Sequence, residues 1–161
     1  MREKIIPRTQ VSALGERLRG AGRRIVFANG CFDILHVGHV RYLQGAKDQG
    51  DVLVVGVNSD RTVCELKGPG RPLLDAGARA ELVAALESVD YVVVFDDPTA
   101  AEVLRDLHPH VHCKGTDYTE KTVPEQEVME SLGGAVRIVG DPKDHSTREV
   151  LSEIVRRYQK H

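Results

Sequence analysis

Two histidines three residues apart offer the clearest chemistry in this sequence. They are His36 and His39, within the segment NGCFDILHVGH at residues 29–39. The segment follows an apolar run expected to form a strand and starts a stretch expected to form a helix, so both imidazoles can point toward one pocket. A helix N-terminus offers backbone N–H groups and a partial positive charge, which suit phosphate. Histidine N–H groups can also donate to phosphoryl oxygens on which charge develops.

Two glycines in the same segment support a ligand site. Gly30 and Gly38 would let the backbone approach a ligand closely. Neither of the common glycine-rich phosphate loops, G-x-G-x-x-G or G-x-x-x-x-G-K-[ST], occurs here. Taken alone, a histidine pair at this spacing more often caps a helix and packs, so the interpretation depends on the rest of the chain.

Three cations further along the chain could also meet phosphate. Lys67 lies in LKGPGRP, whose glycines and prolines predict a mobile loop, although a solvated loop lysine is the plain alternative. Arg71 in the same segment and Arg79, early in an expected helix, carry guanidinium groups that suit phosphate. A cation early in a helix opposes the helix dipole, which favours a functional reason for Arg79.

Polar residues follow two of the expected strands. Asn58, Ser59 and Asp60 stand at the end of one, where ligands bind in parallel sheets. Helix capping by Ser59 or Asp60 explains them about equally well. The segment KGTDY at 114–118 ends another strand, and Gly115 there would permit close approach of a ligand. Ser146 and Thr147 start the last expected helix. Its N-terminus is a second place in the chain that can hold phosphate.

Alternating histidines and an aspartate pair resemble metal sites. His108, His110 and His112 would share one face of an extended segment, but Pro109 interrupts it and no partner ligands have the usual spacing. The pair at 96–97 is expected to begin a loop before a helix cap. We therefore predict no metal ion held by protein side chains.

Short apolar runs alternate with helical patterns along the chain and must position these residues. Expected strands, buried on both faces, are 24–28, 51–57, 91–95, 111–114 and 135–139. Expected helices are 9–20 capped by Thr9, 37–48, one capped by Asp75, 99–107, one with Pro124 in its first turn, and one capped by Ser146 that carries an apolar stripe.

This alternation predicts an α/β fold, a Rossmann-like doubly wound sheet of about five parallel strands. We expect a single domain over residues 1–161, with an N-terminal helix at about 9–20 and a core at about 24–158.

Composition narrows the classes of partner. The formal charge of −2 gives no overall basic field, so neither nucleic acid nor an acidic membrane surface is an expected partner. No stretch approaches the ~20 apolar residues of a membrane span, and the N-terminus does not read as a signal peptide. The three cysteines, Cys31, Cys64 and Cys113, are odd in number and widely spaced, as expected of a cytoplasmic protein.

The HVGH at 36–39, set in NGCFDILHVGH, resembles the HxGH nucleotidyltransferase superfamily. Within it, the chain is most similar to the adenylyltransferases that make ADP-heptose from D-glycero-β-D-manno-heptose 1-phosphate. The resemblance runs from Arg24 to about Ile154. Its further motifs, in chain order, are GVNSD (56–60), LKG (66–68), RP (71–72), the helix with Arg79, VDYVVVF (89–95), KGTDY (114–118), GG (133–134) and ST (146–147).

The resemblance implies an enzyme that transfers AMP from ATP to the sugar phosphate and releases pyrophosphate, with Mg²⁺ bound mainly through the nucleotide. It implies an upstream sugar kinase as pathway partner, and relatives often form homodimers. His36, His39 and Lys67 are then the expected catalytic residues. The expected nucleotide-binding residues are Asn29, Gly30, Cys31, Phe32, Gly38, Lys114, Gly115, Asp117, Tyr118, Ser146 and Thr147. The expected substrate-binding residues are Asp33, Asn58, Asp60, Arg71 and Arg79.

The sequence departs from the family pattern before the last helix. The family usually reads Gly-x-Ser-Thr-Thr, where this chain reads KDHSTR at 143–148, so Arg148 either adds charge to the phosphate site or faces solvent. Cytidylyltransferases for glycerol phosphate carry an arginine five residues before this serine, where Asp141 stands here. Two alternatives stay open: a cytidylyltransferase for glycerol 3-phosphate or a similar ester, and a non-catalytic nucleotide-binding module.

Overall fold

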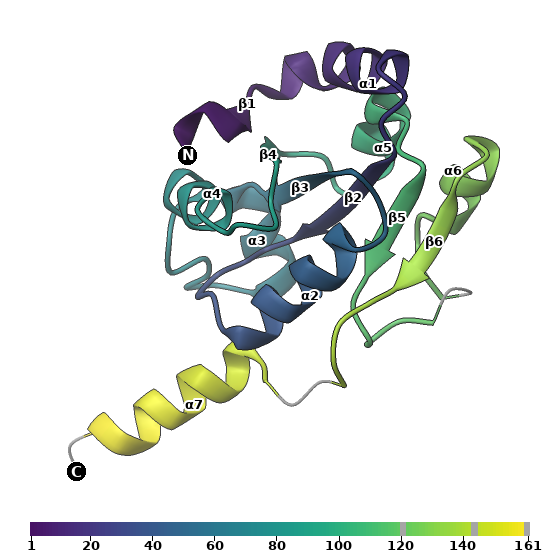
Figure 1. The fold of residues 1–161 in the computed structure, drawn as a ribbon. Coiled ribbons are helices and arrows are strands. Elements are labelled where there is room, and N and C mark those ends of the chain that lie inside the picture. The colour runs from purple at the N-terminus through teal and green to yellow at the C-terminus, as the bar shows by residue number, and fades with distance from the viewer. Residues whose placement is uncertain (120–121, 143–144, 160–161) are drawn as a thin grey trace.

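A computed structural model of the chain, which describes residues 1–119, 122–142 and 145–159, contains a sheet of six parallel strands (Figure 1). The strand order is β1-β4-β3-β2-β5-β6. The expected parallel sheet is therefore confirmed. The strands are β1 (Ile5–Ile6), β2 (Ile25–Gly30), β3 (Val52–Asn58), β4 (Tyr91–Phe95), β5 (Val111–Lys114) and β6 (Ala135–Ile138).

The sixth strand was not predicted. It is β1, a two-residue edge strand that pairs with β4. Two isoleucines are too short a run to distinguish a strand from the start of a helix, so the sequence pattern gave no signal for it.

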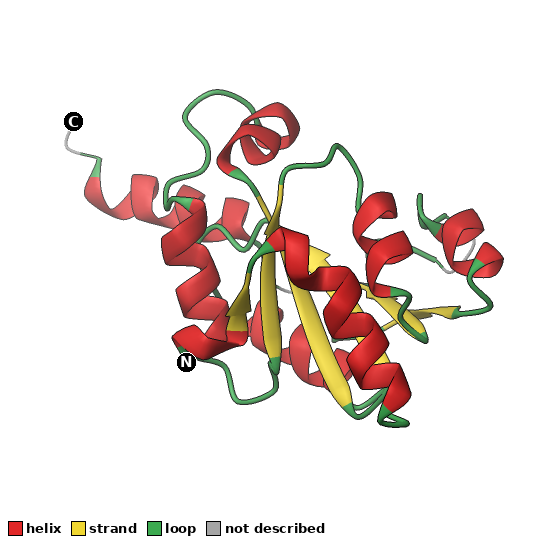
Figure 2. Ribbon diagram, turned by 90° about the horizontal axis from the view of Figure 1, so that it is seen from above, coloured by secondary structure: helices red, strands yellow, loops and turns green. Residues whose placement is uncertain are grey.

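Helices cover both faces of the sheet (Figure 2). One apolar core joins the sheet to α1, α5 and α6, and a second joins its other face to α2 and α4. The helices are α1 (Val11–Gly20), α2 (Val37–Lys47), α3 (Asp60–Lys67), α4 (Ala76–Ala84), α5 (Ala101–Leu107), α6 (Gln126–Ser131) and α7 (Thr147–Tyr158), and two 3-10 turns lie at Arg2–Lys4 and Arg8–Gln10.

The strand order creates a switch point beside the central strand. From β2 the chain adds β3 and β4 on one side, and then returns to place β5 on the other side of β2. The β2–α2 and β5–α6 connections therefore leave the sheet at adjacent carboxyl ends, at Gly30 and Lys114. In parallel α/β sheets this crevice is where ligands bind.

Local capping signals were mostly confirmed. Asp75 accepts a hydrogen bond from the Ala78 N–H at 2.8 Å and begins α4, and Ser146 caps α7. The expected cap at Thr9 was wrong, because a 3-10 turn covers that residue and α1 begins at Val11 without a side-chain cap.

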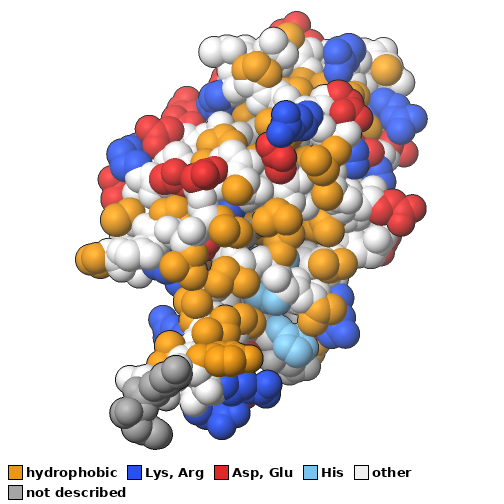
Figure 3. Space-filling view, turned by 90° about the vertical axis from the view of Figure 1, so that its left-hand side faces the viewer, with side chains coloured by type: hydrophobic (Ala, Val, Ile, Leu, Met, Phe, Trp, Pro, Cys, Tyr) orange, Lys and Arg blue, Asp and Glu red, His pale blue; other side chains and the backbone are white. Residues whose placement is uncertain are grey.

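The last helix differs most from expectation. Its apolar stripe was expected, but no residue of α7 is buried, and Figure 1 shows the helix extending away from the sheet. Ile154, Val155 and Tyr158 are 47%, 55% and 77% exposed. Figure 3 shows hydrophobic side chains gathered at this end of the molecule, beside the grey C-terminal residues. Among the described helices, none combines the length and the apolar character that a membrane span requires.

Candidate active site

The two histidines form the start of α2 together. His36 is the N-cap, and its Nδ1 accepts a hydrogen bond from the Gly38 N–H at 3.1 Å. His39, at the third helical position, accepts at Nδ1 from the His36 N–H at 3.3 Å. This is the geometry of a capping box, built here from imidazoles. Because each Nδ1 accepts a backbone proton, each neutral ring carries its own proton on Nε2, where it can be donated.

The two rings lie against each other and leave no room for a side chain at Gly38. Their centroids are 3.9 Å apart with planes 28° from parallel. A Cβ on Gly38 would lie 2.8 Å from Cε1 and 2.9 Å from Nδ1 of His36. Any larger residue would therefore push the His36 ring out of its capping position. The glycine between the two histidines thus has a steric reason.

These histidines line a cleft of about 1440 Å³ at the switch point. Single small-molecule pockets are usually ~300–1,000 Å³, so this cleft has room for two substrates side by side. It brings together 17 of the 19 residues predicted from sequence, because Asp60 and Arg79 do not line it. The 17 are Asn29, Gly30, Cys31, Phe32, Asp33, His36, Gly38, His39, Asn58, Lys67, Arg71, Lys114, Gly115, Asp117, Tyr118, Ser146 and Thr147.

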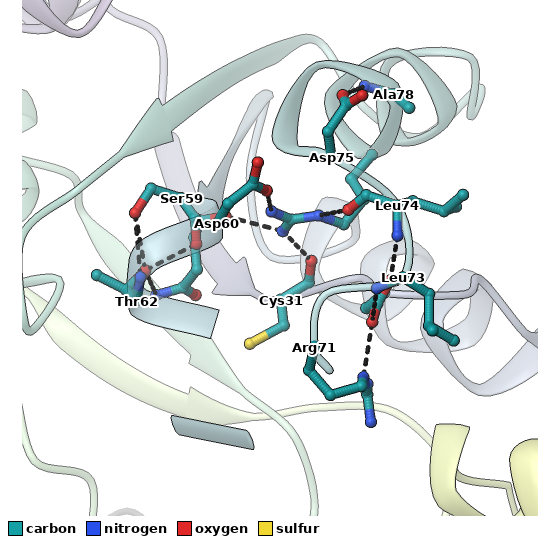
Figure 4. A network of polar contacts seen from close by, with 12 residues as sticks. Cys31, Ser59, Asp60, Thr62, Arg71, Leu73, Leu74, Asp75 and Ala78 are labelled. Atoms are coloured by element: carbon teal, nitrogen blue, oxygen red, sulfur yellow. Dashed lines mark hydrogen bonds and ion pairs between the residues drawn. The ribbon is translucent and has the colours of Figure 1, made fainter. Parts of the chain in front are cut away.

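Arg79 does not line the cleft, and its side chain connects separate elements, among them those of Cys31, Asp60 and Leu74, which Figure 4 labels. Its side chain is fully buried. Nη1 donates to the carbonyl oxygens of Cys31 at 2.6 Å and Asn58 at 2.8 Å, and Nε donates to that of Leu74 at 2.8 Å. Nη2 pairs with the half-exposed Asp60 at 2.8 Å. The expected contact of Arg79 with phosphate does not fit this geometry, because burial and these bonds keep its guanidinium away from the cleft.

Asp33 holds the segment after α3 against the cleft. Its carboxylate is buried and accepts from Arg71 Nε at 2.8 Å and from the backbone N–H groups of Leu73 and Leu74 at 2.9 and 3.1 Å (Figure 4). Burial opposes its ionisation, but the hydrogen bonds outweigh burial and lower the pKa of Asp33. These bonds give the Asp33 oxygens protein donors, although Asp33 also lines the cleft. Arg71 and Lys67 still line the cleft.

Lys67 does not lie in a loop, as the sequence predicted. It is the last residue of α3, which the sequence analysis missed, and the turn begins at Gly68 with φ of 97°. Ser59 caps this helix by accepting from the Thr62 N–H at 3.2 Å. Capping was the plainer of the two explanations offered for Ser59. The side chain of Lys67 is exposed and lines the cleft.

The end of β5 contributes a buried charged pair. Lys114 is 9% exposed and Glu125 is 5% exposed, and Nζ lies 3.9 Å from Oε2. The Tyr118 ring lies 5.1 Å from the same ammonium. Sequence analysis missed Glu125, which stands in a polar loop and follows no motif. It also missed Arg41 and Tyr42, which line the cleft one turn after His39.

The N-terminus of α7 closes one side of the cleft. Ser146 Oγ accepts from the Glu149 N–H at 3.1 Å, and Thr147 Oγ1 donates to the Asp33 carbonyl oxygen at 3.1 Å. The second bond joins α7 to the loop that carries the histidines. Arg148 also lines the cleft. Lys143 and Asp144, which belong to the departure from the family pattern, lie outside the described residues.

The alternating histidines point to different partners. His108 Nε2 lies 3.0 Å from the Leu132 carbonyl oxygen, His110 Nδ1 accepts from the Ile25 N–H at 2.9 Å, and His112 Nε2 lies 2.9 Å from Asn29 Oδ1. Burial lowers the pKa of His112 to about 3. Within the described ranges, no group of three His, Cys, Asp or Glu side chains could hold a metal ion.

The cleft cysteine is poorly suited to covalent catalysis. Burial raises the pKa of the Cys31 thiol, although Lys67, Arg79 and Arg71 oppose the shift. A thiol that stays protonated is a weak nucleophile. The arrangement therefore favours binding and positioning of phosphates over a covalent enzyme intermediate.

Comparison with known proteins gives a consistent result. The model of the cytidylyltransferase-like family matches residues 27–158. The chain is 50% identical over 143 residues to the bifunctional protein HldE of Geobacter metallireducens, covering 89% of this chain and 29% of that protein. It is 46% identical over 155 residues to HldE of Pelobacter propionicus, covering 96% of this chain and 32% of that protein. The chain thus spans about a third of the length of these relatives.

A solved structure agrees with the sequence comparison. It is the lipopolysaccharide core biosynthesis protein from Thermoplasma volcanium, with a TM-score of 0.62 and 31% identity. The match covers 73% of this chain and 95% of that protein. The family match over most of the chain, with the histidine pair at the β2–α2 junction, confirms the resemblance: this chain belongs to the cytidylyltransferase-like family of nucleotidyltransferases.

Proposed function

We propose that this chain transfers AMP from ATP to D-glycero-β-D-manno-heptose 1-phosphate, giving ADP-heptose and pyrophosphate. The observation that carries the proposal is the histidine capping box at the N-terminus of α2, whose two imidazoles both line the switch-point cleft and use Nδ1 as acceptor. Donors fixed before the reaction stabilise charge that develops in the transition state without further reorganisation.

The chemistry needs no protein nucleophile. An oxygen of the heptose phosphate forms a bond to the α-phosphorus of ATP, and the bond from that phosphorus to the oxygen of the β-phosphate breaks. The electron pair leaves with pyrophosphate. Because a phosphate monoester has a second pKa of ~6, the attacking oxygen is already anionic at neutral pH. The protein must align the two phosphates and neutralise them.

Each group of cleft residues has a role in this scheme. His36 and His39 donate to the α- and β-phosphates, and the first turn of α7 at Ser146 and Thr147 offers N–H groups to the remaining phosphates. Lys67 and Arg71 approach from α3 and the turn after it, and bind the sugar phosphate or the leaving group.

Several buried residues support the cleft instead of touching substrate. We assign Asp33, Asp60 and Arg79 to holding its wall, because their polar atoms bind the protein itself.

Magnesium fits this site as an ion carried by the nucleotide. Mg²⁺ prefers oxygen ligands and keeps several waters. Asp117 lines the cleft and would meet the ion or the ribose. When bound, the ion neutralises charge on the triphosphate.

The proteins similar to this chain support heptose over glycerol. The curated relatives are bifunctional HldE proteins, and the solved structure is a lipopolysaccharide core biosynthesis protein. The cytidylyltransferase alternative for glycerol 3-phosphate is not favoured by them. We expect a sugar kinase to supply the heptose 1-phosphate. We also expect this protein to act in the cytoplasm, where ATP is available.

The test is pyrophosphate release with Mg²⁺, comparing ATP with CTP and heptose 1-phosphate with glycerol 3-phosphate. Release with ATP and the heptose alone is the expected result. Release with a different pair would preserve the mechanism and change the substrate. Binding of ATP without any release would favour a non-catalytic nucleotide-binding module.

We also propose that two copies of this chain pair through α7. Its apolar stripe is half-buried at Val150 and Leu151 and exposed at Ile154, Val155 and Tyr158. Glu149 and Arg157 lie eight residues apart beside that stripe. Within one chain, Glu149 accepts from the Ser146 N–H at 3.1 Å and Arg157 pairs with Glu153 at 2.6 Å. In an antiparallel pairing about a two-fold axis near Ile154, Glu149 would face Arg157 of the second copy. The stripe is therefore self-complementary in charge as well as apolar.

A further inference from the structure

Glu125 is a buried carboxylate that the proposed reaction does not use. It is 5% exposed and lies just before α6, yet it lines the cleft. Its Oε2 is enclosed and receives no hydrogen bond from any described residue. Burying a charged oxygen without a donor is costly, so such groups in folded proteins call for an explanation.

Lys114 lies close enough to neutralise the charge of Glu125, but too far away to donate a hydrogen bond to it. Its Nζ is 3.9 Å from Glu125 Oε2, which is an ion-pair distance but beyond hydrogen-bond range. The pair therefore presents a donor beside an acceptor, and each keeps hydrogen-bonding capacity. Burial lowers the pKa of Lys114, while the Glu125 carboxylate opposes that shift and favours the charged ammonium.

The charge of this pair distinguishes it from the phosphate-binding part of the cleft. Lys67, Arg71 and Arg148 line the cleft as cations, and the α7 N-terminus adds partial positive charge. Lys114 and Glu125 together carry no net charge. A donor–acceptor pair without net charge is suited to bind an uncharged polar group, and its electrostatic attraction to a phosphate is weak. Gly115 follows directly, and a Cβ there would meet no protein atom within 4 Å, which leaves open space beside the pair.

We infer that Lys114 and Glu125 read the amino edge of the nucleotide base. An adenine base presents an exocyclic N6–H₂ donor next to a ring-nitrogen acceptor. Glu125 would accept from the amino group, and Lys114 would donate to the ring nitrogen. A base with a keto oxygen at the same place would set an acceptor against the carboxylate, which disfavours it. Cytosine also carries an amino group, so this pair separates amino from keto bases.

This inference rests on the proposed function for the presence of a nucleotide, but not on turnover. The first experiment therefore measures binding to the full chain with Mg²⁺ and no sugar phosphate. The ligands are ATP, ITP, in which a keto oxygen replaces the amino group, and purine riboside triphosphate, which lacks the amino group. We expect ATP to bind roughly 5- to 150-fold more tightly than either analogue. Equal binding of all three would overturn the inference without any variant.

Two variants identify the residue responsible. Glu125→Gln keeps the shape of the side chain but replaces one of its two acceptor oxygens with a donor, so most of the preference for ATP over ITP should be lost. Glu127→Gln, an exposed glutamate two residues away, is the matched control and should keep the wild-type ratio. A Glu125→Gln protein that folds and keeps the wild-type ratio would remove Glu125 from base recognition.

The two proposals fail in different ways. The chain could bind ATP more tightly than ITP and yet release no pyrophosphate from any substrate pair. That result would overturn the proposed activity and leave base reading intact. Pyrophosphate release at equal kcat/KM from ATP and ITP, with heptose 1-phosphate as acceptor, would overturn base reading alone.

Discussion

At the scale of single residues, His36 and His39 combine a structural role with a proposed chemical one. Both Nδ1 atoms complete the cap of α2, which fixes the tautomer that leaves a proton on Nε2. In the proposed reaction the helix would therefore orient its own phosphate donors. A substitution can separate the two tasks, because asparagine is a good N-cap but does not reach as far as an imidazole Nε2.

Replacing His36 by alanine should cut turnover by about 10²- to 10³-fold, the usual effect of removing one fixed transition-state donor. His36→Ala should also lose about 1 kcal/mol of stability with the cap. His36→Asn should lose turnover equally but keep wild-type stability. The measurements are steady-state pyrophosphate release and chemical denaturation. Near-normal turnover in His36→Asn would remove the imidazole from the mechanism.

At the scale of elements, the cleft is held by bonds between segments far apart in the sequence. The Asp33 carboxylate accepts hydrogen bonds from the turn at residues 71–74. Its backbone carbonyl accepts a hydrogen bond from the Thr147 hydroxyl of α7. Arg79 joins the ends of β2 and β3 to α4. These bonds determine where the phosphate-binding residues stand, although they touch no substrate in the proposed scheme.

Asp33→Asn should destabilise the fold by about 1–3 kcal/mol at pH 7, because an amide would face the N–H groups that the carboxylate now accepts. The pKa of Asp33 is lowered in the folded state. Its contribution is therefore complete above the ordinary value of about 3.9 and is lost as the pH falls through the lowered pKa. Denaturation at pH 7, 5 and 3 should show the gap between wild type and variant closing only at the lowest pH. If the stability difference between wild type and Asp33→Asn stayed constant down to pH 3, the stabilising role of the Asp33 carboxylate would be contradicted. Asp48→Asn, at a surface residue, is the control.

Arg79→Met should destabilise the protein by at least about 2 kcal/mol, because the carbonyl oxygens of Cys31, Asn58 and Leu74 lose their donor. Arg79→Lys should be intermediate, since one ammonium cannot replace the planar guanidinium. Arg61→Met, at an exposed arginine, is the control. The measurements are thermal unfolding and the KM for sugar phosphate below the unfolding temperature. If Arg79→Met keeps wild-type stability but shows a large rise in KM, the direct phosphate contact expected from the sequence would be supported instead.

Sequence patterns predicted the elements whose signals are local. The β2–α2 junction, the Asp75 cap and the Ser146 cap each depend on a few neighbouring residues, and all three are present in the structure. The burial of Arg79 was not predictable, because its carbonyl partners come from three separate segments. Glu125 was missed for the same reason: its relation to Lys114 arises only when the loop before α6 returns to the end of β5.

At the scale of the whole molecule, the uncovered stripe on α7 is the main unexplained feature. Periodicity in the sequence showed that the helix has an apolar face, but periodicity does not show what covers that face. Within the described chain, the part of the stripe at Ile154, Val155 and Tyr158 stays exposed. The same helix supplies its N-terminus to the cleft, so whatever covers the stripe would also steady one wall of the site.

If a second copy covers the stripe, light scattering after size exclusion should give twice the 17.7 kDa of one chain. Ile154→Asp places a charge at the centre of the pairing and should give single chains. Leu82→Asp, at a residue on α4 that is 44% exposed, is the matched control and should stay paired.

The charges offer an independent test of orientation. Arg157→Glu should weaken pairing by facing Glu149 of the second copy, and adding Glu149→Arg should restore it, because an antiparallel two-fold places each residue opposite the other. A parallel arrangement would not bring these positions together, so failure of the double variant to recover would exclude the antiparallel geometry. A wild-type protein that stays a single chain at every concentration would overturn pairing itself, and the exposed stripe would then need a different partner.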